Sequence, residues 1–229
     1  MISNKISYLL FISLLVFHTN SGQADTPLNS FSLYHEMKLN QLMDYKVFKY
    51  AIDGYNKIPV KKPILTVIDF TKPSTSKRLF VIDLKLKKLL LSTHVAHGKN
   101  SGNNYATSFS NTPSSYKSSL GFFLTERTYQ GKNGYSLILE GLEKGINARA
   151  KERAIVIHGA DYCDPSLLSS RGRLGRSLGC PALPRQVSRK VIDLIKEGSL
   201  LFIFGKDIRY EKQSPILSAP LQHALHPSP

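Results

Sequence analysis

Residues 64–69 read ILTVID, residues 78–84 read RLFVIDL, and residues 88–96 read KLLLSTHVA. Each run is short and apolar, and the first two are rich in β-branched residues, which is typical of buried strands. The second and third runs flank a lysine-rich reversal, so they predict a hairpin. A β-sheet is therefore expected at the centre of the fold.

The rest of the chain adds strands and few helices. Residues 185–196 carry apolar side chains at helical spacing and predict one late helix. Residues 98–119 are polar and without a period, which predicts a long loop of the kind that is functional or disordered. Further strands are predicted at the apolar runs 121–129, 135–142, 154–158 and 200–204.

The N-terminal part has a different pattern. Apolar residues recur at helical spacing over 32–56 and predict a helix that Gly54 and Pro59 end. We therefore expect four segments: a signal peptide at 1–24, an N-terminal helical segment and linker at 25–62, a mostly β domain at 63–206 and a flexible tail at 207–229.

The first residues have the layout of a secretory signal peptide. Lys5 precedes the apolar run 6–17, and small or polar residues lead to Ala24, after which we expect cleavage. An uncleaved membrane anchor is the alternative. The prediction is an exported protein of the periplasm or cell envelope that meets the membrane only through this segment.

The chain is strongly basic. It carries 31 Lys and Arg against 16 Asp and Glu, a formal net charge of +15. Such a surplus suits a polyanionic environment. For an exported protein, an anionic cell wall or membrane surface is the better partner. The basic residues are also scattered and no nucleic-acid motif accompanies them, so no nucleic acid is expected. A generally solvated basic surface is the alternative.

A candidate nucleophile lies at Cys180, and a candidate base lies at His158 at the end of the run 154–158. The thiolate is the attacking form of cysteine, and a nearby imidazole activates it as a base or as an ion-pair partner. The alternatives are a buried structural cysteine and a histidine that caps a strand.

The residues around the pair fit this chemistry. Gly179 lets the chain turn sharply, so that backbone N–H groups can point at one oxyanion. His158 needs an orienting acceptor, and Ser177 or the backbone near Gly159 is nearest in sequence. Among three arginines before the cysteine, Arg176 is the preferred contact for a substrate carboxylate and Arg173 the next candidate; a solvated basic loop is the alternative.

Two other uses of the cysteines are weighed. A bridge between Cys163 and Cys180 is possible and would silence Cys180. A metal site would draw on His94, His97, His158 and the cysteines, but no closely spaced pair resembles a zinc site. No metal and no cofactor is expected.

These residues lie in a set of motifs that resembles the L,D-transpeptidase (YkuD-like) family, and in particular its murein L,D-transpeptidase catalytic domain branch. The likeness runs from about residue 64 to residue 205. The motifs are AIVIHGADY at 154–162, GRLGRS at 172–177, GCPALP at 179–184, VAHG at 95–98, NSGNNYAT at 100–107 and SLGF at 119–122.

The resemblance implies a mostly β fold, described as a β-sandwich, here with an N-terminal helix and one late helix. It implies that Cys180 attacks the L-to-D peptide bond of a peptidoglycan stem while His158 moves the proton and N–H groups at Gly179 and Cys180 hold the oxyanion. D-alanine leaves, and an amine, usually that of diaminopimelate, resolves the acyl-enzyme into a 3→3 crosslink. Asn104 and Tyr105 of the asparagine-rich motif join the substrate-binding candidates.

The chain departs from the broader family beside the nucleophile. Leu178 stands where a histidine is usual, and Ala182 where a polar residue is frequent. Because Gly159 lacks a hydroxyl, a carbonyl is expected to orient His158. Two rival functions remain: a carboxypeptidase or endopeptidase that uses the same thiol, and a non-catalytic wall-binding module.

Overall fold

Eight strands form one mixed sheet in this computed structural model, which describes residues 26–220. The predicted signal peptide at 1–24 and residues 221–229 lie outside the described residues. The strands follow the apolar runs of the sequence, because each run can bury its side chains within the sheet. Their bounds are β1 (Ile64–Asp69), β2 (Leu79–Asp83), β3 (Lys88–Thr93), β4 (Gly121–Gly131), β5 (Gly134–Gly141), β6 (Val156–Gly159), β7 (Ala182–Leu183) and β8 (Leu200–Phe204).

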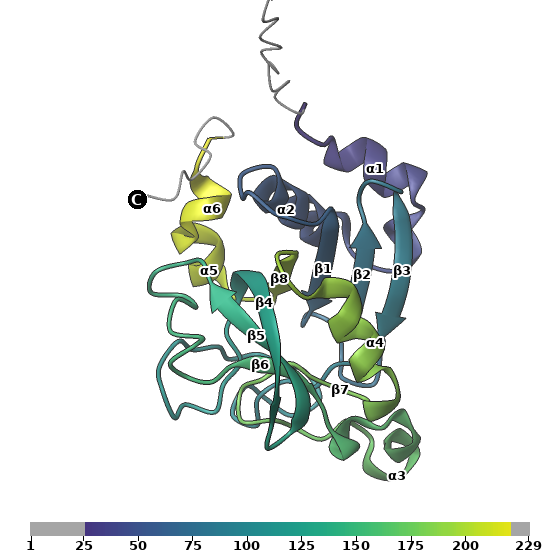
Figure 1. Ribbon diagram of the computed structural model, residues 1–229, viewed down its shortest axis with the longest axis vertical. Helices are drawn as coiled ribbons and strands as arrows, with labels where there is room; N and C mark the ends of the chain where they lie inside the picture. The colour runs from purple at the N-terminus through teal and green to yellow at the C-terminus, as the bar shows by residue number, and fades with distance from the viewer. Residues whose placement is uncertain (1–25, 221–229) are drawn as a thin grey trace, which may run out of the picture.

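The strand order is β3-β2-β1-β8-β4-β5-β6-β7 (Figure 1). The last strand, β8, enters the middle of the sheet, where it pairs parallel to β1 and antiparallel to β4. All five of its residues are buried. Because β8 joins the β1–β3 half to the β4–β7 half, the strands form one sheet, and the predicted two-sheet sandwich is not observed.

The two outer ends of this sheet come together. The chain that continues from β3 forms an isolated bridge from Ala96 to Ala182 of β7, with Ala96 N donating to Ala182 O at 2.8 Å. Gly98 forms a second bridge with Ser177. The mostly β fold is therefore a nearly closed, barrel-like sheet, and the seam lies directly beside the turn that carries Cys180.

Helices cover the sheet and complete the core. The helix predicted over 32–56 is divided in two, because Lys38 adopts a left-handed conformation with φ 53° and Asp44 caps a new start. The late helix is confirmed as α4. The helices are α1 (Ser30–Glu36), α2 (Tyr45–Tyr55), α3 (Leu168–Arg171), α4 (Arg185–Ile195), α5 (Ile208–Gln213) and α6 (Pro215–Ser218), with 3₁₀ turns at Leu39–Gln41, Asp161–Cys163 and Pro165–Leu167. In the described part of the chain, no helix is long and apolar enough to cross a membrane.

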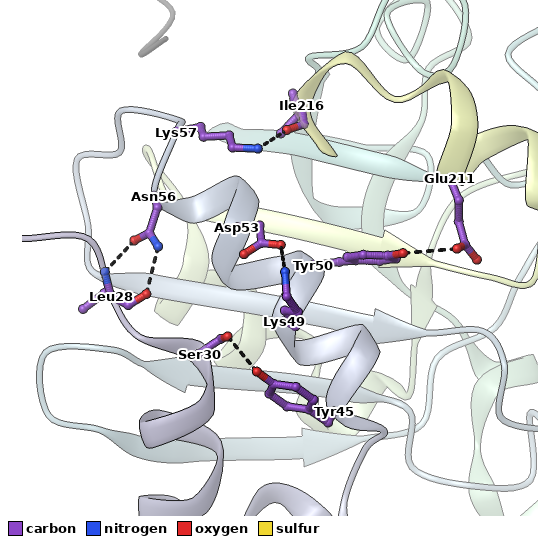
Figure 2. A network of polar contacts seen from close by, with 10 residues as sticks. All are labelled: Leu28, Ser30, Tyr45, Lys49, Tyr50, Asp53, Asn56, Lys57, Glu211 and Ile216. Carbon is purple, nitrogen blue, oxygen red and sulfur yellow. Dashed lines mark hydrogen bonds and ion pairs between the residues drawn. The ribbon is translucent and has the colours of Figure 1, made fainter. Parts of the chain in front are cut away.

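The chain after residue 206 departs from the prediction of a flexible tail as far as residue 218, where α5 and α6 contact α2 and the turn that follows it. Figure 2 shows Lys57 Nζ donating to Ile216 O at 2.6 Å and Tyr50 Oη donating to Glu211 Oε2 at 3.2 Å. Ile216 is buried, which anchors α6. Prolines in this part start a helix rather than prevent one, since Pro215 occupies its first turn.

Candidate active site

Strands β6 and β7 bring His158 and Cys180 to the same edge of the sheet. The two strands are parallel, and His158 pairs with Ala182. Extending that register by two residues places Cys180 beside Val156, and Val156 N lies 3.5 Å from Cys180 Sγ as a weak donor. Cys180 itself lies in the bend just before β7, two residues from Ala182, the residue that pairs with His158.

The two faces of β6 have different neighbours. Residues alternate along a strand, so Val156 and His158 share one face with their cross-strand partners Ile138 and Ser136 of β5. The other face packs on α4: a Cβ on Gly159 would lie 2.5 Å from Ser188 Oγ. His158 therefore points away from α4, toward the face that the Cys180 turn borders. Gly159 is required here because α4 approaches so closely.

The turn that presents Cys180 is held by Ser177. Ser177 Oγ accepts from Gly179 N at 3.0 Å and donates to Cys180 O at 2.6 Å. Gly179 has φ 131°, and a Cβ there would lie 3.0 Å from Lys117 O. Ser177 therefore does not orient His158, because its hydroxyl is bonded within the turn, and the Gly179 N–H that was expected to face an oxyanion is donated to Ser177 Oγ instead.

His158 is oriented by a carbonyl, as the sequence predicts. Its Nδ1 lies 3.0 Å from Gly159 O. Because a carbonyl only accepts, Nδ1 carries the proton in a neutral ring and Nε2 keeps its lone pair. Burial lowers the pKa of His158, the Gly159 carbonyl partly opposes this, and the charge of Arg185 lowers it further. The resting imidazole is therefore neutral and suited to accept a proton.

The Cys180 thiol is also neutral at rest. Its Sγ lies 3.5 Å from Ala154 O, and the residue is partly exposed. Burial raises the pKa of Cys180, while the Val156 N–H, the Arg153 charge and its own N–H oppose the rise. Within residues 26–220, no hydrogen bond joins Sγ to His158. Of the two roles weighed for His158, these pKa directions favour a general base over a thiolate–imidazolium ion pair.

Arg153 belongs to this site and was not predicted from the sequence. Its guanidinium is the charge that acts on the Cys180 thiol. It also donates to Ser110 O and Lys117 O, each at 2.6 Å, and to the hydroxyls of Ser115 and Ser119. Arg153 thereby holds the polar loop 98–119 next to Cys180. Nothing in the sequence distinguishes it from the many other basic residues.

Most of the predicted substrate-binding residues make side-chain hydrogen bonds within the protein, and Tyr105 stays exposed. Arg176 Nη1 donates to Lys99 O at 3.2 Å and to Gly102 O at 3.0 Å, so it stabilises a loop. Arg173 Nη1 donates to Leu174 O at 2.8 Å. Asn104 Oδ1 accepts from both the N–H and the hydroxyl of Ser74. Tyr105 is half exposed and available. The nearby arginines and Asn104 therefore hold the loops around the site.

A buried polar pair supports the same loops. Arg78 is fully buried and donates to Val95 O and to His97 Nδ1, the latter at 2.8 Å. Burial and the charge of Arg78 lower the pKa of His97 to about 4, so the ring stays neutral. His97 O accepts from Ser177 N at 2.9 Å. The pair therefore positions the Cys180 turn through Ser177.

Cys163 does not bridge Cys180. Both cysteines are free, Cys163 is fully buried, and burial raises its pKa to about 12. It is therefore inert as a nucleophile at neutral pH. Within the described residues, no group of three or more His, Cys, Asp or Glu side chains is placed to hold a metal ion.

A cavity of about 500 Å³ lies against the segment of β6 that Cys180 contacts. Its wall includes Ala154, Ile155 and Val156, and two of these residues contact Cys180 Sγ through backbone atoms. Strands β4 and β5 contribute Tyr129 and Ile138. A ligand in this cavity therefore lies next to the backbone segment 154–156 that Cys180 Sγ contacts.

The fold and the site define a mostly β protein in which a cysteine and a histidine lie at the seam of a nearly closed sheet. The family model described as L,D-transpeptidase catalytic domain matches residues 39–204. The chain belongs to this family.

Solved structures similar to this chain carry the same description. An L,D-transpeptidase from Mycobacterium smegmatis is 13% identical with a TM-score of 0.39, over 62% of this chain and 59% of that chain. One from Stackebrandtia nassauensis is 16% identical with a TM-score of 0.38, over 77% and 76%. One from Xylanimonas cellulosilytica is 12% identical with a TM-score of 0.35, over 69% of each chain. The chain thus spans 59% of the mycobacterial enzyme. No curated protein matches the sequence.

Proposed function

We propose that this protein is an exported L,D-transpeptidase that crosslinks peptidoglycan stem peptides through an acyl-enzyme on Cys180. The proposal rests on one observation above all: β6 and β7 place the Cys180 sulfur against Val156, with the oriented His158 two residues farther along the same face. Family membership supplies the class of reaction, and the site supplies the residues that perform it.

The chemistry proceeds in two halves. His158 Nε2 takes the proton of the thiol, after the Cys180 side chain turns from Ala154 O toward the ring. The sulfur attacks the carbonyl carbon of the L-to-D bond, and Cys180 N–H stabilises the oxyanion. As the C–N bond breaks, His158 returns its proton to the departing amine, leaving a thioester. The acceptor amine attacks that thioester, its extra proton restores the thiol, and a new amide is formed.

The charge of the chain supports a place in the cell envelope. A net charge of +15 favours association with an anionic wall. A signal peptide at 1–24 would deliver the mature protein there. Hydrolysis of the same thioester by water is the second candidate, because a partly exposed Cys180 leaves the acyl group accessible to solvent.

Two measurements test this function. Intact mass after incubation with a carbapenem should show a covalent adduct on the wild type and on Cys163→Ala but not on Cys180→Ala. Cys163→Ala is the matched control, because it removes the other, buried thiol. An adduct that survives Cys180→Ala, or none at all, contradicts the proposal. Incubation with tetrapeptide muropeptides then separates transfer, which gives dimers, from hydrolysis, which gives only tripeptides.

A further inference from the structure

The cavity beside Cys180 carries one guanidinium that the protein leaves without a partner. Arg127 lines the cavity on β4, across from Ala154 to Val156. It is exposed, and within residues 26–220 it makes no hydrogen bond or ion pair. The other cations near the site are engaged: Lys151 pairs with Glu126 and Glu140, and Arg153 with the loop 98–119.

A β-bulge sets the direction of the Arg127 side chain. The register between β4 and β5 shifts between Thr125 and Thr128, so Glu126 and Arg127 lie in the irregular stretch. Bulges redirect side chains and are frequent next to active sites. Here the irregular stretch brings both residues to the wall of the cavity, while Ile138 and Val156 provide an apolar part of its lining.

The charges of the surroundings favour an anion in one cavity over the other. Arg127 also borders a second cavity of about 420 Å³, whose lining holds the carboxylates of Glu126, Glu140 and Glu197 against two cations, Arg127 and Lys61. Because carboxylates outnumber cations there, that cavity is the less favourable of the two for an anionic ligand. Among the described residues that line the cavity beside Cys180, Glu126 is the one carboxylate, and it stands against two cations, Arg127 and Lys151, of which Lys151 pairs with it at 2.6 Å. A ligand carboxylate is thus directed to the side of Arg127 that faces the nucleophile.

We propose that this cavity is a subsite for the peptide substrate and that Arg127 binds one of its carboxylates. The inference rests on the proposed function and adds the residue that binds a carboxylate of the stem peptide. It takes the place expected for Arg176, whose Nη1 donates to the loop carbonyls of Lys99 and Gly102. A planar guanidinium matches a carboxylate in a bidentate contact, so replacing either group is expected to weaken binding about tenfold.

Equilibrium binding tests the subsite without turnover. Calorimetric titration of Cys180→Ala uses a tetrapeptide stem and versions in which each carboxylate is amidated in turn. Amidation of one of the carboxylates should weaken binding to Cys180→Ala about tenfold. The double variant that also carries Arg127→Gln should bind the unmodified peptide about tenfold more weakly, and it should bind the amidated and unmodified peptides equally. Arg189→Gln is the control, because Arg189 lies on α4, behind the sheet, where it packs over the Tyr135 ring.

The two proposals fail in different ways. If the double variant with Arg127→Gln binds the unmodified peptide as tightly as Cys180→Ala alone, or if no amidation changes the affinity, the subsite assignment is wrong. If the discrimination is present but a carbapenem does not acylate Cys180 in the protein that retains Arg127, the subsite stands and the enzymatic function is wrong.

Discussion

Glu143 makes stability depend on pH in a direction that can be worked out from its surroundings. The side chain is fully buried and accepts hydrogen bonds from Phe122 N at 2.7 Å, from the Tyr210 hydroxyl and from the Ser214 hydroxyl. No lysine or arginine pairs with it among the described residues. Burial therefore raises its pKa from 4.5 to about 6, and the hydrogen bonds only partly oppose the rise.

A raised carboxylate pKa means that the folded state holds the proton more tightly than the unfolded state. The resulting stability is fully present below pH 4.5 and is lost as pH rises through 6. The rise from 4.5 to about 6 corresponds to about 2 kcal/mol of unfolding free energy. Glu143→Gln cannot ionise and keeps an acceptor for Phe122 N, so it should escape this loss.

The assay is urea unfolding of the wild type and Glu143→Gln at pH 4.5, 5.5 and 7. The free energy of unfolding of the wild type relative to the variant should fall by about 2 kcal/mol across this range. Glu36→Gln, at an exposed position, controls for the loss of one carboxylate. A difference that is constant with pH, or that grows in favour of the wild type, would refute the assignment of Glu143 as a buried, unpaired carboxylate.

Two further predictions concern the Cys180 turn. Arg153→Gln removes the positive charge that opposes the rise in the Cys180 pKa, so the pH profile of carbapenem acylation should move to higher pH. Arg149→Gln changes an exposed arginine that pairs with Glu152, and it should leave the profile in place. An unshifted profile for Arg153→Gln would show that Arg153 does not act on Cys180. Gly179→Ala places a Cβ 2.9 Å from Ile155 Cδ1 at φ 131°, so acylation should slow at least about tenfold. Gly145→Ala has a similar positive φ but open space around its Cβ, and it should acylate normally; equal rates for the two variants would contradict the steric argument.

The elements of the fold were largely predictable, because each strand buries a short apolar run. The predicted runs 64–69 and 200–204 became β1 and β8 with the same bounds. Their arrangement was not predictable in the same way: β8 is last in sequence but central in the sheet, and nothing within its five residues specifies its neighbours. The helices after residue 206 were predicted as a tail because Pro215, Pro220 and Pro227 interrupt this stretch, whereas tertiary contacts of Ile216 and Ser214 hold it.

The site was predictable where residue type decides the chemistry and not where contacts decide it. His158 and Cys180 lie 22 positions apart, and the parallel pairing of β6 with β7 brings them to one edge. Arg176 and Asn104 had the right chemistry for a ligand, but loop carbonyls and Ser74 occupy them. Arg127 and Arg153 carry no sequence signal, since a bulge and a loop give them their positions.

The neutral resting state of the pair has a consequence for the mechanism. Burial disfavours the charged form of both Cys180 and His158, so a thiolate is not stored before the substrate arrives. The groups that oppose this effect, Arg153 and the N–H of Cys180, act only on negative charge. In the proposed mechanism, that charge moves from the thiol to the carbonyl oxygen of the substrate as the sulfur attacks. Under the proposed mechanism, the donors that lower the thiol pKa therefore also stabilise the transition state, and they contribute most when the charge develops.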